Sequence, residues 1–181
     1  MSKKFTISLV AAMGKNRVIG KVGARLGLPW DLPDDRTFFR TITLGKPIIE
    51  GLKTYEATGR LLPDRPTIIL THDRDFTVHG ATVVHSTNEA LNVAREKAEE
   101  FQTDEIMVIG GGQIFAEFLP QADRMYLTLV NEVFEGESYF PKFDESDWRE
   151  VNRDHHGKDE RHVYSFDIVT FDRVRGSKVA M

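Results

Sequence analysis

Four apolar residues run directly into three glycines in the stretch Ile106-Met107-Val108-Ile109-Gly110-Gly111-Gly112, and this pattern is the strongest indication of the fold. Apolar residues then recur at helical intervals as far as Pro120: Ile114, Phe115, Phe118 and Leu119. This order predicts a strand, a glycine turn and a helix. A strand without alternating polar residues is typical of a parallel sheet that is covered on both faces, so the segment indicates an α/β fold.

Similar patterns predict the rest of the fold. We expect strands over residues 5–13, 46–49, 66–70, 106–109, 124–131 and 162–171. We expect helices over residues 34–44 and 53–58, from the capping-box pair Ser86 and Glu89 to Phe101, and after the glycine turn. The last two strands alternate in polarity and are joined by an acidic connection, which is typical of an antiparallel edge. The expected architecture is a single α/β domain with a central, mostly parallel, twisted sheet of about eight strands, an antiparallel C-terminal edge strand and about four flanking helices.

One long segment contains no regular pattern. Residues 14–33 contain too many glycines and prolines for a helix, so we expect a surface loop of the kind that forms lids. The domain is expected to cover residues 1–174, and residues 175–181 are expected to form a frayed tail.

Composition excludes several classes of protein. The chain has 181 residues, of which 40% are hydrophobic and 29% are charged, so it is neither collagen-like nor largely disordered. A formal net charge of -4 argues against binding nucleic acid through bulk charge, and the lack of cysteine excludes disulfides and a thiol nucleophile. The apolar run 5–14 is too short to cross a membrane, and the histidines lack metal-ligand spacing. We expect a cytoplasmic protein that binds neither a metal nor a membrane.

One carboxylate shares a helical face with apolar residues at i+3, i+4 and i+7: Asp35 with Phe38, Phe39 and Ile42. A carboxyl group among phenylalanines would have a raised pKa and could handle protons near neutral pH. Alternatively, Asp35 could be a first-turn acid that only stabilises the helix dipole. Its neighbour Asp34 is expected to face solvent. The spacing leaves both interpretations of Asp35 open.

The glycine turn and two arginines are candidate anion sites. Glycines let the backbone approach a phosphate closely, although a simple tight turn would use the same residues. Only the first two glycines match the dinucleotide-binding fingerprint, because Phe115 stands where the third is needed. Arg60 and Arg65 flank residues 61–64 and could grip a carboxylate in a bidentate fork, or they could be solvated surface residues.

In order and spacing, these segments resemble the dihydrofolate reductase family over residues 7–171, nearly the whole chain. The motifs that carry the resemblance are Ile7-Ser8-Leu9-Val10-Ala11-Ala12, Arg17-Val18-Ile19-Gly20, Leu28-Pro29-Trp30-Asp31-Leu32-Pro33 with Asp35 and Phe39, Thr43-Leu44-Gly45-Lys46-Pro47, Gly59-Arg60 with Leu62-Pro63 and Arg65, Val108-Ile109-Gly110-Gly111-Gly112, Tyr126-Leu127-Thr128 and Phe140-Pro141.

The resemblance implies reduction of 7,8-dihydrofolate to 5,6,7,8-tetrahydrofolate, which feeds one-carbon and thymidylate metabolism. A hydride would pass from the nicotinamide of NADPH to the protonated pterin. We expect a monomer whose partners are small molecules and not nucleic acid. Two alternatives stay open: a related pterin-like or pyrimidine reductase, and a non-catalytic module that binds NADPH or folate.

The same resemblance implies three catalytic residues. Asp35 would bind the pterin amino group and ring nitrogen and promote protonation of the imine, Thr128 would orient Asp35, and Trp30 would close over the pterin with the loop 14–28. Arg65 would hold the α-carboxylate of the glutamate tail. The full set of further implied substrate contacts is Val10, Ala11, Phe39, Arg60, Leu62, Arg65 and Ile109.

The cofactor would lie over the glycine turn, where the family joins the first two glycines by a cis peptide bond. Residues 110–115 would hold its pyrophosphate. The implied cofactor-binding residues are Ala12, Ile19, Gly20, Gly51, Lys53, Thr54, Thr71, His72, Gly110, Gly111, Gly112, Gln113, Ile114 and Phe115.

Several positions depart from the family pattern. Leu52 stands where an arginine commonly grips the adenosine 2′-phosphate, so we expect a smaller than usual preference for NADPH over NADH. Glu50 and Arg36 stand where apolar residues are usual, and Phe115 where many members have tyrosine. Arg36 could reach the glutamate tail or point to solvent. The lid is a few residues longer through residues 21–27, from which we expect altered closure kinetics.

Overall fold

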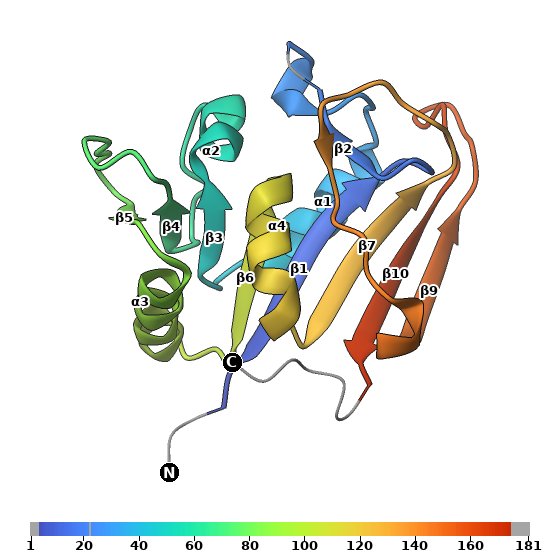
Figure 1. Ribbon diagram of the computed structural model, residues 1–181. Coiled ribbons are helices and arrows are strands. Elements are labelled where there is room, and N and C mark those ends of the chain that lie inside the picture. Colours follow the sequence, from blue (N-terminus) through green and yellow to red (C-terminus); the bar gives the residue numbers. More distant parts are fainter. Residues whose placement is uncertain (1–3, 22, 175–181) are drawn as a thin grey trace.

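An eight-stranded sheet forms the centre of the computed structural model, which describes residues 4–21 and 23–174 (Figure 1). Its strands are β1 (Thr6–Met13), β3 (Ile48–Gly51), β4 (Thr67–Leu70), β5 (Thr82–Val84), β6 (Glu105–Gly110), β7 (Arg124–Val130), β9 (Trp148–His156) and β10 (Phe166–Arg173). They are arranged in the order β5-β4-β3-β6-β1-β7-β10-β9. All neighbours from β5 to β7 are parallel, and β10 is antiparallel to β7 and β9. The expected sheet architecture is confirmed.

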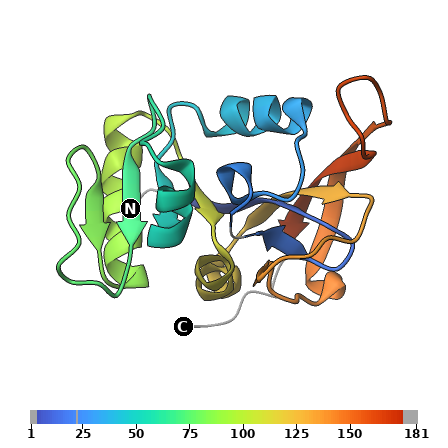
Figure 2. The ribbon, with the colours of Figure 1, turned by 90° about the horizontal axis from the view of Figure 1, so that it is seen from above.

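Helices cover both faces of this sheet. In Figure 2, α1 (Pro33–Thr43) lies on one side of the sheet and α4 (Gly112–Phe118) on the other. Apolar residues of α3 (Thr87–Glu100) and α4 pack together in the largest buried cluster, whereas α1 presents Phe39 and Ile42 to a smaller cluster. The short helix α2 (Leu52–Thr58) directly follows β3. Single 3₁₀ turns complete the set: η1 (Arg25–Gly27), η2 (Leu119–Gln121) and η3 (Glu145–Asp147).

Two helices predicted from local sequence patterns are present in the structure. The capping box forms as expected, because the Ser86 hydroxyl accepts a hydrogen bond from the backbone N–H of Glu89 at 3.1 Å. The helix expected after residue 33 is α1, with both Asp34 and Asp35 in its first turn.

The structure adds three features to the sequence-based expectation. The strand β5 was not expected, and the acidic connection after β7 contains β9, which is the actual edge of the sheet. All residues of β9 between Trp148 and His156 are exposed, so this strand carries no apolar period. The expected loop 14–33 contains β2 (Val18–Gly20), which pairs with β8 (Ser138–Tyr139) in a two-stranded sheet.

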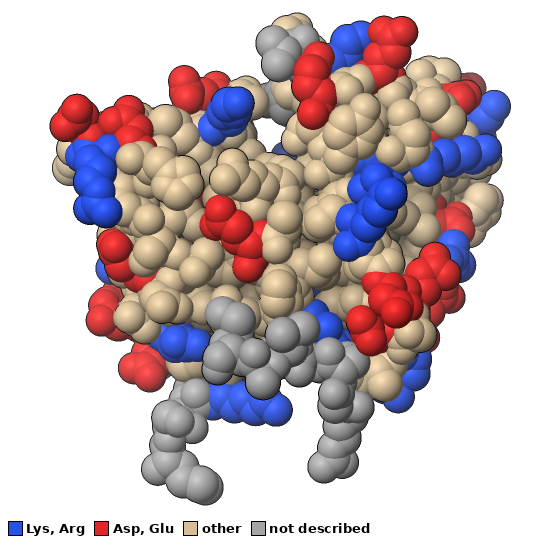
Figure 3. Space-filling view, in the orientation of Figure 1, with Lys and Arg blue, Asp and Glu red and all other residues tan. Residues whose placement is uncertain are grey.

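Charged side chains of both signs are interspersed over the face shown in Figure 3. Figure 3 shows a small opening near the upper edge of this face, and in the same region Gly27 of η1 packs against Ala57 of α2. Across the described part of the chain, no helix combines the length and the apolar character that a membrane crossing needs.

Candidate active site

Asp35 meets Thr128 in the space between α1 and the sheet. Thr128 lies on β7, where it pairs with Ala12 of β1, and Asp35 lies in the first turn of α1. The Thr128 hydroxyl donates a hydrogen bond to Asp35 Oδ1 at 2.5 Å, and Thr128 is itself buried. Of the two orientations that the spacing leaves open, Asp35 adopts the inward one.

Burial governs the protonation of this carboxyl group. Because removal from water disfavours the charged form, burial raises the pKa of Asp35 to about 6. The hydrogen bond from Thr128 and the charges of His156 and Arg36 act in the opposite direction and lower the pKa. The result is an acid that exchanges its proton close to neutral pH, which is the range that general acid catalysis requires.

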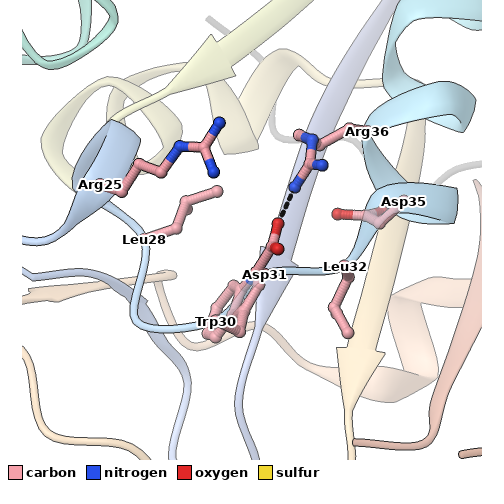
Figure 4. Close-up of a pocket in the computed structure, with 7 residues that line it drawn as sticks. All are labelled: Arg25, Leu28, Trp30, Asp31, Leu32, Asp35 and Arg36. Atoms are coloured by element: carbon pink, nitrogen blue, oxygen red, sulfur yellow. Dashed lines mark hydrogen bonds and ion pairs between the residues drawn. The ribbon is translucent and has the colours of Figure 1, made fainter. Parts of the chain in front are cut away.

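A pocket opens beside Asp35 (Figure 4). Its lining comes from α1 and from the loop before it: Arg25, Leu28, Trp30, Asp31, Leu32, Asp35 and Arg36. Arg36 forms an ion pair with Asp31, so its guanidinium is held over the pocket and does not simply point to solvent. Trp30 packs against Phe134 with ring centroids 4.9 Å apart, and its buried indole N–H has no hydrogen-bond partner among the described residues. Such a donor is suited to an acceptor on a ligand.

An apolar floor extends from the pocket along α1. Four residues that the resemblance assigns to substrate binding belong to one cluster with Ile48 and Met107: Val10, Phe39, Leu62 and Ile109. Ile42 and Tyr126 pack against the same cluster. These residues come from β1, α1, the segment after α2, and β6, and the fold brings them together.

Arg65 lies at the far end of α1, where it is 8% exposed. Its guanidinium donates hydrogen bonds to Thr43 Oγ1 at 2.7 Å, to the Arg40 carbonyl oxygen at 2.8 Å and to the carbonyl oxygen of Pro63. These bonds use three of the five N–H groups and fix the plane of the fork. The solvated alternative is therefore wrong for Arg65, whereas Arg60 is exposed.

The glycine turn is crowded from two sides. A cis peptide bond joins Gly110 to Gly111, as the resemblance implies, and Gly110 has a φ of 122°, which side chains rarely adopt. A Cβ atom at Gly112 would lie 2.5 Å from the carbonyl oxygen of Tyr139, and one at Gly111 would lie 3.4 Å from Thr54 Oγ1. At Gly110 and Gly112 the turn therefore presents bare backbone that a larger residue could not replace, whereas a Cβ atom at Gly111 would be in ordinary contact with the threonine hydroxyl.

Comparison with known proteins now decides the family. Residues 6–173 match the family profile described as dihydrofolate reductase. The chain is 40% identical over 172 residues to a dihydrofolate reductase of Bacillus subtilis (strain 168), covering 95% of this chain and 97% of the relative. It is 37% identical over 169 residues to the dihydrofolate reductase type 3 of Salmonella typhimurium, covering 93% and 99%.

The chain belongs to the dihydrofolate reductase family. A solved structure agrees: the dihydrofolate reductase from Enterococcus faecalis, complexed with NADP(H) and RAB-propyl, superposes with a TM-score of 0.81. It is 35% identical in sequence, and the match covers 93% of this chain and 96% of that chain.

The remaining residues that resemblance to dihydrofolate reductase assigns to the cofactor form two groups. One group follows β3 and β4, at the carboxyl ends of neighbouring parallel strands: Gly51, Lys53, Thr54, Thr71 and His72. The other lies on β1 and β2, beside the substrate candidate Ala11: Ala12, Ile19 and Gly20. Gln113 is exposed, but Ile114 and Phe115 are buried in the main core. Only the backbone of these two residues is therefore available to a ligand.

Glu50 stands at a position where the resemblance implies an apolar residue. It lies on β3 next to Gly110 of β6 and is 4% exposed. Burial raises the pKa of Glu50 to about 7, and no hydrogen bond or charged neighbour contributes to this shift. A polar residue at this family position is thus accommodated inside the sheet.

The sequence predicted that Asp34 faces solvent and gave no indication of its tertiary contacts. Arg161 Nη1 lies 3.2 Å from Asp34 Oδ1, and the Asp34 backbone N–H donates to His162 Nε2 at 3.2 Å. These partners lie more than 120 residues away in the chain, so no local pattern could reveal them. Within the described residues no group of histidine and acidic side chains is arranged to hold a metal ion.

Proposed function

We propose that the protein is an NADPH-dependent dihydrofolate reductase, which converts 7,8-dihydrofolate to 5,6,7,8-tetrahydrofolate. The observation that carries the proposal is the partly buried Asp35 carboxyl group, held by Thr128 and open to a pocket, in a chain of this family. The reaction consumes one NADPH and one proton. A hydride adds to the carbon of the pterin C=N bond, and the proton adds to its nitrogen.

Asp35 and Thr128 supply the acid-base part of this reaction. A carboxylate has two oxygens, so Asp35 accepts from the amino group and a ring nitrogen of the pterin while Thr128 fixes its orientation. With a pKa of about 6, the group is protonated in about one molecule in ten at pH 7 and exchanges its proton readily there, so it can promote protonation of the imine nitrogen. Trp30 and Leu28 line this part of the pocket and restrict water.

The rest of the substrate would follow α1. Eight residues separate Asp35 from Thr43, which corresponds to about 12 Å of helix axis. The apolar cluster around Val10 and Phe39 lies along this path, and Arg65 is bonded to Thr43 at its end. The Asp35 carboxyl group, the apolar cluster and the Arg65 guanidinium therefore match, in this order, a pterin, a benzoyl ring and a glutamate carboxylate.

The glycine turn fits a dinucleotide cofactor. Its bare backbone and the adjacent Thr54 hydroxyl leave room for a pyrophosphate where side chains would intrude. Lys53 and His72, both exposed, lie toward the adenosine end of this site. When bound, NADPH supplies the hydride, and the Enterococcus faecalis relative was solved with NADP(H).

The decisive assay is oxidation of NADPH followed as loss of absorbance, with and without dihydrofolate. We expect oxidation that requires dihydrofolate and produces tetrahydrofolate in equal amounts. Binding of both compounds without turnover would favour a non-catalytic module. Turnover of other pterins or of reductive pyrimidine substrates, with none of dihydrofolate, would favour a related reductase.

The proposal extends to assembly and location. We propose that the enzyme works as a monomer in the cytoplasm and binds no nucleic acid, consistent with its net charge of -4. Sedimentation at assay concentrations tests the first statement, cell fractionation tests the second, and retention on nucleic acid tests the third.

A further inference from the structure

The N-terminus of α1, the helix that carries Asp35, has no side-chain cap from its own N-cap residue. Its N-cap residue is Leu32, which offers no side-chain acceptor, and Pro33 has no backbone N–H. The N–H groups of Asp35 and Arg36 both bond to the Leu32 carbonyl oxygen at 3.1 Å. The backbone N–H of Asp34 is left to find an acceptor outside the helix.

His162 provides that acceptor from the connection between β9 and β10. Its Nε2 accepts the Asp34 N–H at 3.2 Å, and its side chain is 1% exposed. Its Nδ1 lies 2.8 Å from Asp159 Oδ1, so Nδ1 carries the hydrogen and Nε2 the free electron pair. The same Asp159 oxygen accepts the backbone N–H groups of Arg161 and His162, each at 2.8 Å. The imidazole is thus oriented by a rigid turn.

Further contacts hold this connection against the start of α1. Arg161 Nη1 lies 3.2 Å from Asp34 Oδ1, and His156 Nδ1 lies 3.9 Å from Asp34 Oδ2. Both histidine rings pack on Phe166 at the beginning of β10, His156 at 4.6 Å and His162 at 5.4 Å between centroids. The capping group is therefore anchored to the sheet.

From these contacts we infer that His162 is a positioning residue: it caps α1 from outside the helix and so keeps Asp35 buried against Thr128. The inference rests on the proposed function, because it is the acid of that reaction that His162 positions. Neither His162 nor Asp159 lines the pocket, so both act through the helix and not on the substrate.

Loss of the cap has a defined consequence for Asp35. An uncapped first turn opens more readily, and water then reaches the carboxyl group. Since burial is what raises the pKa of Asp35, the pKa falls toward its ordinary value of 3.8. A fall of about one pH unit lowers the protonated fraction at pH 7 about tenfold, and the rate of hydride transfer with it. With or without the cap, the groups that act on Asp35 are Thr128, His156 and Arg36. The charged groups that face His162 are Asp34 and Asp159.

Two substitutions separate the acceptor from the volume of the ring. His162→Phe keeps an aromatic ring against Phe166 but removes the acceptor, whereas His162→Gln retains an acceptor oxygen at similar reach. We expect His162→Phe to lower the midpoint of the rate–pH profile by about one unit and the rate at pH 7 about tenfold. We expect His162→Gln to stay within about threefold of the parent enzyme. His155→Ala is the matched control, because His155 is 68% exposed and bonds to Asp167, away from α1.

A second readout needs no turnover. The pKa of Asp35 is measured by NMR of carboxyl-labelled aspartate in the ligand-free protein, and it should fall in His162→Phe but not in His155→Ala. Asp159→Ala, at an exposed site, should shift it in the same direction if His162→Phe does not fold. An unchanged pKa in these variants, or equal shifts in His162→Phe and His162→Gln, would overturn the inference. Lack of dihydrofolate reduction by the parent protein would instead overturn the proposed function.

Discussion

At the scale of single residues, the carboxyl groups of the partly buried Asp35 and the buried Glu50 set the pH behaviour of this protein. Burial raises the pKa of Asp35 to about 6 and that of Glu50 to about 7. A hydrogen bond and nearby positive charge partly offset the effect of burial on the pKa of Asp35, whereas burial alone acts on the pKa of Glu50. The first group serves the proposed reaction, and the second affects the stability of the fold.

Glu50 should make the protein less stable at alkaline pH. Its pKa is higher in the folded chain than in the unfolded chain, so its favourable contribution is complete below about pH 4.5 and is lost as the pH rises through 7. The difference amounts to about 3 kcal/mol at most. We expect Glu50→Gln to gain stability over the parent as the pH rises from 5 to 8, measured by urea unfolding. Glu56→Gln, at an exposed site on α2, is the control, and an equal pH dependence in Glu50→Gln and the parent would contradict this account.

Arg36 lies at the pterin end of the proposed substrate site. Its guanidinium lines the same pocket as Asp35 and pairs with Asp31, whereas Arg65, assigned to the glutamate tail, is bonded to Thr43 about 12 Å of helix axis away. Of its two possible roles, contact with the glutamate tail is therefore not favoured. We expect Arg36→Leu to leave KM for dihydrofolate within about threefold of the parent value, because Arg36 and Asp31 form a partly exposed ion pair. A rise of about tenfold or more, absent for a pterin substrate without the glutamate tail, would contradict this and place Arg36 at the tail.

At the scale of elements, α1 links the two ends of the substrate site, and α2 borders the cofactor site. Leu52 is the first residue of α2, directly after Gly51. Lys53 supplies a positive charge in the same segment, but a lysine is a point charge and lacks the bidentate fork of arginine.

Restoring that fork should change cofactor choice. We expect Leu52→Arg to lower KM for NADPH about tenfold and to leave KM for NADH unaffected, because only NADPH carries the 2′-phosphate. Steady-state kinetics with both cofactors measure the ratio. A large preference for NADPH in the parent enzyme would show that Leu52 does not weaken discrimination.

The elements also show what local sequence can predict. Helix α3 has a cap and a regular apolar face, and the glycine turn follows an unbroken apolar run, so both are recognised from neighbouring residues alone. The strand β9 is exposed along most of its length and exists because its backbone pairs with β10, so its side chains give no signal. The short β2 depends in the same way on β8.

At the scale of the whole molecule, the candidate site is built from segments that are far apart in the chain. The apolar spacing of α1 singles out Asp35, but its hydrogen-bond partner Thr128 is 93 residues away and enters only through resemblance to the family. His162 lies 128 residues from Asp34, and neither spacing nor resemblance indicated it. Local patterns identify which residues are chemically unusual, and tertiary packing determines which of them meet.

Asp35 is the proton-handling acid of the proposed hydride transfer. The most direct test is the single-turnover rate of hydride transfer from NADPH to dihydrofolate, measured from pH 5 to 9 for the parent enzyme and Asp35→Asn. The parent rate should fall as the pH rises above about 6, where Asp35 loses its proton. Asp35→Asn should be slower by roughly 100-fold or more at pH 7 and should lose this pH dependence. An Asp35→Asn enzyme that keeps the parental rate and the parental pH profile would contradict the account.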